Sequence, residues 1–156
     1  MENKKEFYND LYNELYSLIG DERNTVAILA NISALLNYHM KDINWVGFYL
    51  VNDNELILGP FQGNPACMHI PFTKGVCGAC YRNDETIIVD NVHNFFGHIA
   101  CDSNSNSEIV IPIHKNNEIV GLLDIDSPIY SRFDNEDKLG LERIVAMLEM
   151  VIWLEE

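Results

Sequence analysis

The 156-residue chain carries 24 acidic against 10 basic side chains, which gives a formal net charge of -14, and 47% of its residues are hydrophobic. This length suits one domain with a real core, and we expect a single domain over residues 1–156. The acidic field repels phosphate backbones and anionic membranes, which excludes nucleic acid and membrane as favoured partners and suits a ligand with an ammonium group.

The first residues are polar and lead into a helical pattern, without a signal peptide or a long apolar run. We therefore expect a cytoplasmic protein. Because the cytosol keeps most thiols reduced, the four cysteines are expected to be buried thiols, metal ligands or redox-active groups.

Apolar residues at helical spacing predict a first helix that ends at Gly20, with Phe7, Leu11, Leu15 and Leu18 on its inner side. A second helix follows, and from Asn44 the period changes to that of strands. Strands are predicted over 45–51, 55–61, 67–72, 86–89, 109–114 and 119–126, and a short helix over 75–82. A final helix is predicted to begin at the cap Asp134 and to carry an apolar inner side of Ile144, Val145, Leu148, Val151 and Ile152. This order predicts an α+β fold with an antiparallel sheet of about six strands and helices mainly on one side.

Cys101 lies in a long polar segment, residues 90–107, that is rich in Ser and Asn. Such a segment bonds to its own backbone and buries little apolar surface, so the thiol stays reachable. Taken alone, this segment favours a solvated connector that happens to hold a cysteine, and the carboxylate of Asp102 disfavours a thiolate beside it.

Cys77 and Cys80 have the C-x-x-C spacing and, with His69, His93 and His98, suggest zinc. A structural zinc site usually shows a second close pair of ligands, so we expect no metal. A packed core thiol is the better interpretation of Cys80, which has apolar neighbours.

A redox interpretation requires one thiolate that attacks and a second thiol that converts the resulting sulfenic acid into a disulfide. Cys101 and Cys67 are both flanked by turn-forming segments, so they are candidates for two thiols that meet at the mouth of one site.

The last predicted strand ends with two acids, Asp124 and Asp126, which the period of two places on one face with Val120 and Leu122. Burying both without a partner is costly, so a solvated strand end is the competing interpretation.

Glu108 could add a third acid, but a two-residue turn at Asn116 and Asn117 pairs it with Ile125, on the opposite face. Either a bulge near Pro112 shifts the phase, or Glu108 belongs to the loop. Three adjacent acids would bind an ammonium group and could hold one carboxyl protonated, as a general acid requires.

Trp45 and Tyr49 alternate along the first predicted strand and can share a face. Core packing explains them without further assumption. As the wall of a pocket they would suit a thioether or another soft apolar tail.

Six segments together resemble the free methionine-(R)-sulfoxide reductases, which are single GAF domains that act on the free amino acid. The resemblance covers essentially the whole chain. It rests on Asp-Ile-Asn-Trp-Val-Gly-Phe-Tyr-Leu at 42–50, Leu-Gly-Pro-Phe-Gln-Gly at 58–63, Gly-Val-Cys-Gly at 75–78, Gly-His-Ile-Ala-Cys-Asp at 97–102, Ser-Asn-Ser-Glu-Ile-Val at 105–110 and Leu-Asp-Ile-Asp-Ser at 123–127.

The resemblance implies a GAF-like fold and a role for each matching residue. Cys101 would be the nucleophile, Cys67 the resolving cysteine and Cys77 an auxiliary redox residue, whereas Cys80 matches no family cysteine. Asp126 would protonate the sulfoxide oxygen. The substrate would be bound by Glu108, Asp124, Trp45 and Tyr49.

The implied activity is reduction of free L-methionine (R)-sulfoxide through a sulfenic acid and an intramolecular disulfide. A thioredoxin-type reductant would recycle the enzyme and no cofactor is expected; the R preference comes from the resemblance alone, and a homodimer is left open. The alternatives are a non-catalytic GAF module that senses a small ligand and a zinc-stabilised adaptor.

Overall fold

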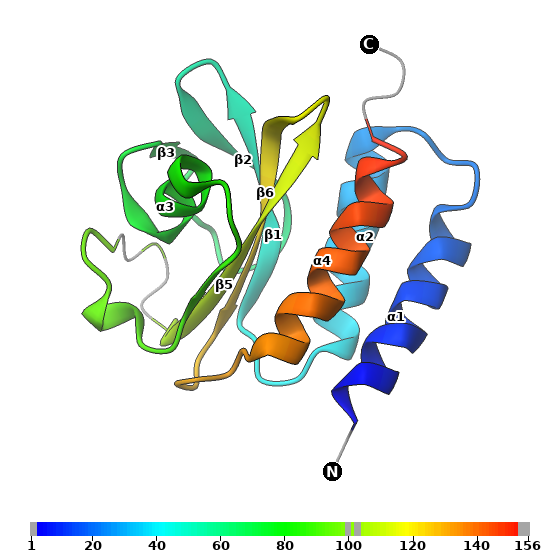
Figure 1. Cartoon of the computed structure of the whole chain (residues 1–156), viewed down its shortest axis with the longest axis horizontal. Helices are drawn as coiled ribbons and strands as arrows, with labels where there is room; N and C mark the ends of the chain where they lie inside the picture. Colours follow the sequence, from blue (N-terminus) through cyan, green and yellow to red (C-terminus); the bar gives the residue numbers. More distant parts are fainter. Residues whose placement is uncertain (1–2, 99–100, 102–103, 153–156) are drawn as a thin grey trace.

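A six-stranded antiparallel sheet, in the order β3-β2-β1-β6-β5-β4, separates the helices into two unequal groups (Figure 1). The structure is a computed structural model that describes residues 3–98, 101 and 104–152. Its helices are α1 (Lys4–Ile19), α2 (Thr25–His39), α3 (Gly75–Asn83), the 3-10 helix η1 (Val92–Asn94) and α4 (Asn135–Glu149). Its strands are β1 (Trp45–Asn52), β2 (Glu55–Gly63), β3 (His69–Pro71), β4 (Ile87–Val89), β5 (Ser107–Lys115) and β6 (Glu118–Ser127).

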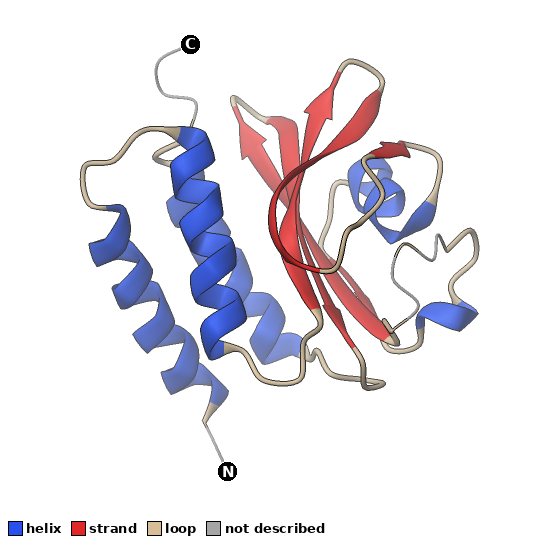
Figure 2. Ribbon diagram, turned by 180° about the vertical axis from the view of Figure 1, so that it is seen from behind, coloured by secondary structure: helices blue, strands red, loops and turns tan. Residues whose placement is uncertain are grey.

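The helices form layers on the two sides of the sheet (Figure 2). Helices α2 and α4 cover one face and α1 packs outside them, whereas α3 lies on the opposite face. The predicted α+β fold, with its antiparallel sheet and helices mainly on one side, is confirmed. None of the described helices combines the length and the apolar character needed to cross a membrane.

The predicted boundaries differ from the structure at several elements, most clearly at the third strand, the polar segment and the last helix. The third strand is only His69–Pro71, so Cys67 lies in the loop before it, and the polar segment contains η1. Helix α4 ends at Glu149, and Val151 and Ile152 follow in a turn. The helical spacing of apolar residues in the sequence extends past the end of α4, because Ile152 is still buried in the core.

Side chains alternate between the two faces of the sheet along the central strands, so the sheet separates two hydrophobic cores. On β5, Ile109 and Ile111 face the helix pair, whereas Val110 faces α3. The helix α1 is rotated from the predicted register, because Tyr8 and Ile19 are buried with the predicted leucines and Leu18 is 48% exposed. The prediction that Leu18 faces inward is therefore wrong.

A β-bulge changes the phase of the β5–β6 hairpin. His114 pairs with Ile119 next to the turn, but Ile113 pairs with Gly121, so Val120 is an extra residue on β6. Val120 packs against the helix-side core, and the prediction that it shares a face with the acids is wrong.

The bulge places Glu108 directly opposite Asp126 across the β5–β6 ladder, and Asp124 opposite Val110. Because the side chains of directly paired residues point to the same face, all three acids share the α3 side of the sheet. Of the two solutions that the sequence allowed for Glu108, the bulge is confirmed.

A buried carboxylate joins the start of α4 to α1. Asp134 and Asp137 form a reciprocal capping box, in which each side chain accepts a hydrogen bond from the backbone N–H of the other. Asp137 is 1% exposed and also accepts hydrogen bonds from the Tyr8 hydroxyl at 2.7 Å and the Lys4 ammonium at 2.6 Å.

The substitution Asp137→Ala is expected to lower the free energy of unfolding by about 2–4 kcal/mol, because it removes a cap and leaves the Tyr8 hydroxyl buried without its acceptor. Chemical denaturation measures the change. The control Glu136→Ala alters an exposed residue in the same turn and should stay within about 0.5 kcal/mol. Equal losses in the two variants would show that the buried network adds nothing.

Candidate active site

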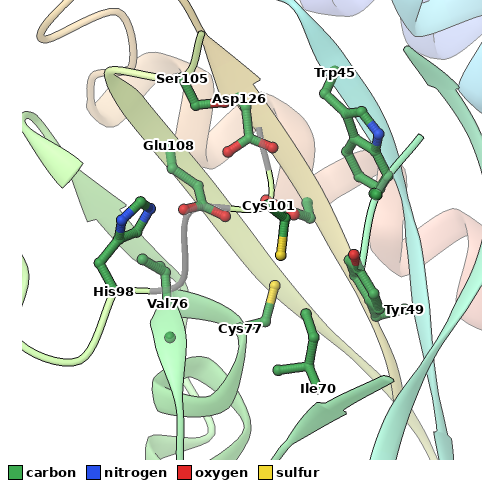
Figure 3. Close-up of a pocket in the computed structure, with 13 residues that line it drawn as sticks. Trp45, Tyr49, Ile70, Val76, Cys77, His98, Cys101, Ser105, Glu108 and Asp126 are labelled. Atoms are coloured by element: carbon green, nitrogen blue, oxygen red, sulfur yellow. The ribbon is translucent and has the colours of Figure 1, made fainter. Parts of the chain in front are cut away.

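A small cavity lies between α3 and the sheet, where the pocket-side residues of β1, β5 and β6 converge (Figure 3). Strand β1 contributes an aromatic wall, β5 and β6 contribute the carboxylates, and α3 contributes a thiol. The cavity is lined by Trp45, Tyr49, Ala66, Ile70, Gly75, Val76, Cys77, His98, Cys101, Ser105, Glu108, Asp124 and Asp126.

The aromatic wall is held from both sides. The rings of Trp45 and Tyr49 stack with centroids 5.9 Å apart. The indole N–H donates to the Asn64 carbonyl at 3.1 Å, and the Tyr49 hydroxyl donates to the Cys67 carbonyl at 2.9 Å. These bonds satisfy the polar ends of both rings and fix the wall to the loop that carries Cys67.

Gly47 makes room for this wall. A Cβ atom at Gly47 would lie 2.3 Å from the Phe61 Cβ and 2.8 Å from the Trp45 Cη2. Any side chain at this position would therefore displace the Trp45 indole or the neighbouring strand, which explains the glycine between the two aromatic residues.

The carboxylates of Glu108 and Asp124 are each 6% exposed, and Asp126 beside them is half-buried. Burial raises the pKa of Glu108 well above its ordinary value, and the charges of Asp124 and Asp126 raise it further. Burial also raises the pKa of Asp124, although hydrogen bonding with Glu108 and Cys77 lowers it in part. The cluster therefore favours a retained proton on Glu108.

A disulfide joins Cys67, in the loop before β3, to Cys101, 34 residues later, and both residues are half-buried. Cys101 lines the cavity together with the three acids (Figure 3), so one sulfur of the disulfide borders the acid cluster. The two candidate thiols thus meet at one site. Asp102, expected to disfavour the thiolate, lies outside the described residues.

The two cysteines of the C-x-x-C pair have different surroundings. Cys77 lines the cavity, and burial raises the pKa of its thiol, followed by the charges of Asp124 and Glu108. Cys80 is fully buried, and its Sγ lies 3.7 Å from the Val110 carbonyl oxygen. Its prediction as a packed core thiol is confirmed.

The three histidines that suggested zinc do not join this pair. His69 contacts Glu55 at 2.9 Å, and His93 contacts Asn106 at 2.8 Å. His98 alone reaches the cavity, on the side opposite Trp45 (Figure 3). Burial lowers the pKa of His98, and the neighbouring His93 lowers it further.

Sequence reasoning treated His98 only as one of several metal candidates and missed its place in the cavity. No other basic side chain of the described residues lines the cavity. Its position three residues before Cys101 was the available signal, since a residue so close to a candidate nucleophile shares its loop. Ser105, Ile70 and Val76 were missed as lining residues as well.

The sheet order and the cavity beneath α3 define a GAF domain with a cysteine pair at its ligand site, and the GAF domain family matches residues 5–152. The free methionine-R-sulfoxide reductase of Escherichia coli is 51% identical over 150 residues, which cover 96% of this chain and 91% of that protein. The chain belongs to the free methionine-R-sulfoxide reductase family, a family of oxidoreductases.

Two solved structures agree with this assignment. The fRMsr of Staphylococcus aureus in complex with substrate is 57% identical with a TM-score of 0.88, covering 92% of this chain and 94% of that chain. The free methionine-R-sulfoxide reductase of Neisseria meningitidis in complex with its substrate is 40% identical with a TM-score of 0.92, covering 96% and 90%.

Proposed function

We propose that this protein reduces free L-methionine (R)-sulfoxide to L-methionine, with Cys101 as nucleophile and Cys67 as resolving cysteine. The observation that carries the proposal is the Cys67–Cys101 disulfide beside three carboxyl groups that share one face of the sheet. The family relationship supplies the substrate class.

The reaction uses the acid cluster to make the sulfoxide sulfur electrophilic. Asp126 protonates the sulfoxide oxygen, and Glu108, its cross-strand neighbour, is suited to supply the next proton. The Cys101 thiolate attacks the substrate sulfur, and the hydroxyl is then transferred from that sulfur to the Cys101 Sγ as the bond between the two sulfurs breaks. Methionine leaves with the electron pair, and Cys101 becomes a sulfenic acid.

The second half of the reaction removes the oxygen as water. The Cys67 thiol attacks the sulfenic acid, and the Cys67–Cys101 disulfide forms as water leaves. A dithiol reductant of the thioredoxin type then returns both cysteines to thiols and becomes a disulfide itself. We assign Cys77, deeper in the same cavity, an auxiliary redox role.

The cavity matches a zwitterion at both ends. Glu108 and Asp124 are placed to receive the ammonium group, and the aromatic wall of Trp45 and Tyr49 suits the sulfur-bound methyl group. His98, whose lowered pKa favours the neutral imidazole, can donate its ring N–H to the substrate carboxylate. A peptide, which lacks both free termini, would lose these contacts and collide with the walls.

Incubating the protein with the separate isomers of free methionine sulfoxide and dithiothreitol tests the function. Methionine should form from the R isomer, and the S isomer and a peptide-bound sulfoxide should remain. A non-catalytic sensor, the alternative for a GAF domain, would bind the ligand and release it unchanged. The preferred physiological reductant and a cytoplasmic location stay predictions.

Cys67→Ser is expected to leave one rapid turnover but to slow steady-state reduction by thioredoxin. Cys101 would still accept oxygen, but its sulfenic acid would lack the Cys67 thiol that closes the disulfide. Rapid-quench measurement of methionine, with trapping of the sulfenic acid by dimedone, separates the two phases. Unchanged steady-state turnover would remove Cys67 from the role of resolving cysteine.

His98→Leu, which has no hydrogen-bond donor, is expected to raise KM for free methionine sulfoxide about tenfold or more and to change kcat little, because a hydrogen bond to a charged group is worth about 1.5–3 kcal/mol. Methioninol sulfoxide, which has a hydroxymethyl group in place of the carboxylate, serves as the control substrate. The substitution should hardly affect its KM. Equal losses for both substrates would place the carboxylate elsewhere.

A further inference from the structure

Three buried groups from different elements meet in the wall of the cavity. Cys77 of α3, Glu108 of β5 and Asp124 of β6 each offer one potential ligand atom, and these atoms all lie within 4.8 Å of one another. All three residues are at least nine-tenths buried. The set differs from the C-x-x-C candidate of the sequence, because Cys80 is replaced by carboxylates from the two central strands.

A second observation points to a ligand at this place. The Oδ1 atom of Asp124 is buried and has no hydrogen-bond partner among the described residues. A buried acceptor without a partner costs free energy, and the cost is larger when the group is charged. In addition, no lysine or arginine of the described residues lines the cavity, so the carboxylates have no resident cation.

We propose that Cys77, Glu108 and Asp124 form a binding site for a thiophilic divalent cation, for which Zn²⁺ is the best match. Zinc takes thiolate and carboxylate ligands at about 2.0–2.3 Å in tetrahedral geometry, which separates ligand atoms by about 3.3–3.8 Å. The three ligand atoms, which all lie within 4.8 Å of one another, would have to approach by at most about 1.5 Å to reach that spacing. The side of the cation toward the cavity remains open for a fourth ligand.

The ligand set also selects among cations. Mg²⁺ and Ca²⁺ prefer sets made only of oxygen, so a buried thiol at the site disfavours them. Zn²⁺ and its spectroscopic substitute Co²⁺ accept both sulfur and oxygen. Binding exchanges protons for the cation and involves no change of oxidation state.

The site has a regulatory consequence, which rests on the proposed function. The substrate ammonium and Zn²⁺ would use the same two carboxylates, Glu108 and Asp124, so they cannot be bound there together. Zinc would then act as a reversible inhibitor that competes with methionine sulfoxide, and it would hold the Cys77 thiol away from oxidants.

The binding test uses the disulfide form of the protein, in which Cys67 and Cys101 are bonded to each other and cannot coordinate metal. Titration of Zn²⁺ against a chromophoric chelator should give stoichiometric binding, and millimolar Mg²⁺ should not displace the metal. Free methionine, added as a competitor that needs no turnover, should weaken the apparent zinc affinity.

Variants locate the site. Cys77→Ser should raise the Kd for zinc at least about tenfold, since even the loss of groups that merely orient ligands costs that much. Cys80→Ser, which alters the other buried thiol, should leave the Kd unchanged. His114→Gln tests a surface alternative, because His114 contacts Asp84 and Glu149. Loss of binding in His114→Gln and not in Cys77→Ser would overturn the proposal.

Spectroscopy on the unmodified chain keeps the test independent of how the variants fold. Co²⁺ bound to the disulfide form should show a thiolate-to-cobalt charge-transfer band, and absence of that band would overturn the proposal. The outcomes are separable from the function: zinc binding without reductase activity refutes only the proposed reaction, and activity without zinc binding refutes only this site.

Discussion

Cys101→Ser is expected to lower kcat/KM for free methionine sulfoxide at least about a thousandfold, because it removes the proposed nucleophile and a serine hydroxyl does not form a sulfenic acid. The variant should form no disulfide after exposure to substrate. Measurement of methionine under single-turnover conditions distinguishes this loss from slow recycling, since a missing nucleophile abolishes even the first turnover.

Cys80→Ser is the matched control for this substitution. It makes the same change of sulfur to oxygen at a buried thiol that lies outside the cavity, beside the Val110 carbonyl. The kcat/KM of Cys80→Ser for free methionine sulfoxide should stay close to that of the unmodified protein. If Cys101→Ser still reduced methionine sulfoxide at a rate comparable to the control, the nucleophile would have to be another cysteine, and Cys77 would be the next to test.

Asp126→Asn is expected to lower kcat about a hundred- to ten-thousandfold, which is the usual contribution of a positioned general acid. The amide keeps the size of the side chain but cannot deliver the proton that makes the sulfoxide sulfur electrophilic. Thermal unfolding should change little, because the substitution also removes one negative charge from a crowded acid cluster. Rate and stability are therefore expected to respond separately.

The control Asp53→Asn makes the same chemical change at the tip of the β1–β2 hairpin, where the residue has a φ of 55° that asparagine tolerates. It should leave both kcat and stability unchanged. If Asp126→Asn kept the full rate, the proton donor would be elsewhere, and the raised pKa of Glu108 would make Glu108→Gln the next variant.

The periodicity of the sequence predicted the fold well because each element buries one clear face. The periodicity predicted the wrong orientation for Leu18. The tyrosines give α1 two apolar faces of similar width, and packing against α4 determines which of the two is buried. It also could not decide where β3 begins, because a strand of three residues has too few positions to show alternation.

The site was predictable to a different degree for different residues. Asp124 and Asp126 were predicted to share a face because they lie two residues apart on one strand. Glu108 joins them only through a bulge that the sequence allowed but did not require. The turn-forming segments around Cys67 and Cys101 made the two thiols candidates for one site, but only the family resemblance assigned them as nucleophile and resolving cysteine, because partners 34 residues apart in loops have no local signal. The place of Cys77 beside the acids depends on how α3 packs on the sheet. The role of each residue, and the extent of one domain over residues 1–156, stay predictions.

The extra residue on β6 has a consequence for how this chain can vary. Val120 lies near the turn, most of a strand away from Asp126. As the extra residue of the bulge, it determines which residues of β5 and β6 are paired along the rest of the hairpin. A homologue that lost Val120 would form a regular hairpin and keep Glu108 opposite Asp126, whereas one that gained a residue without a further bulge would place Glu108 and Asp126 on opposite faces of the sheet. Insertions in this hairpin would therefore remove an acid from the cavity at its opposite end.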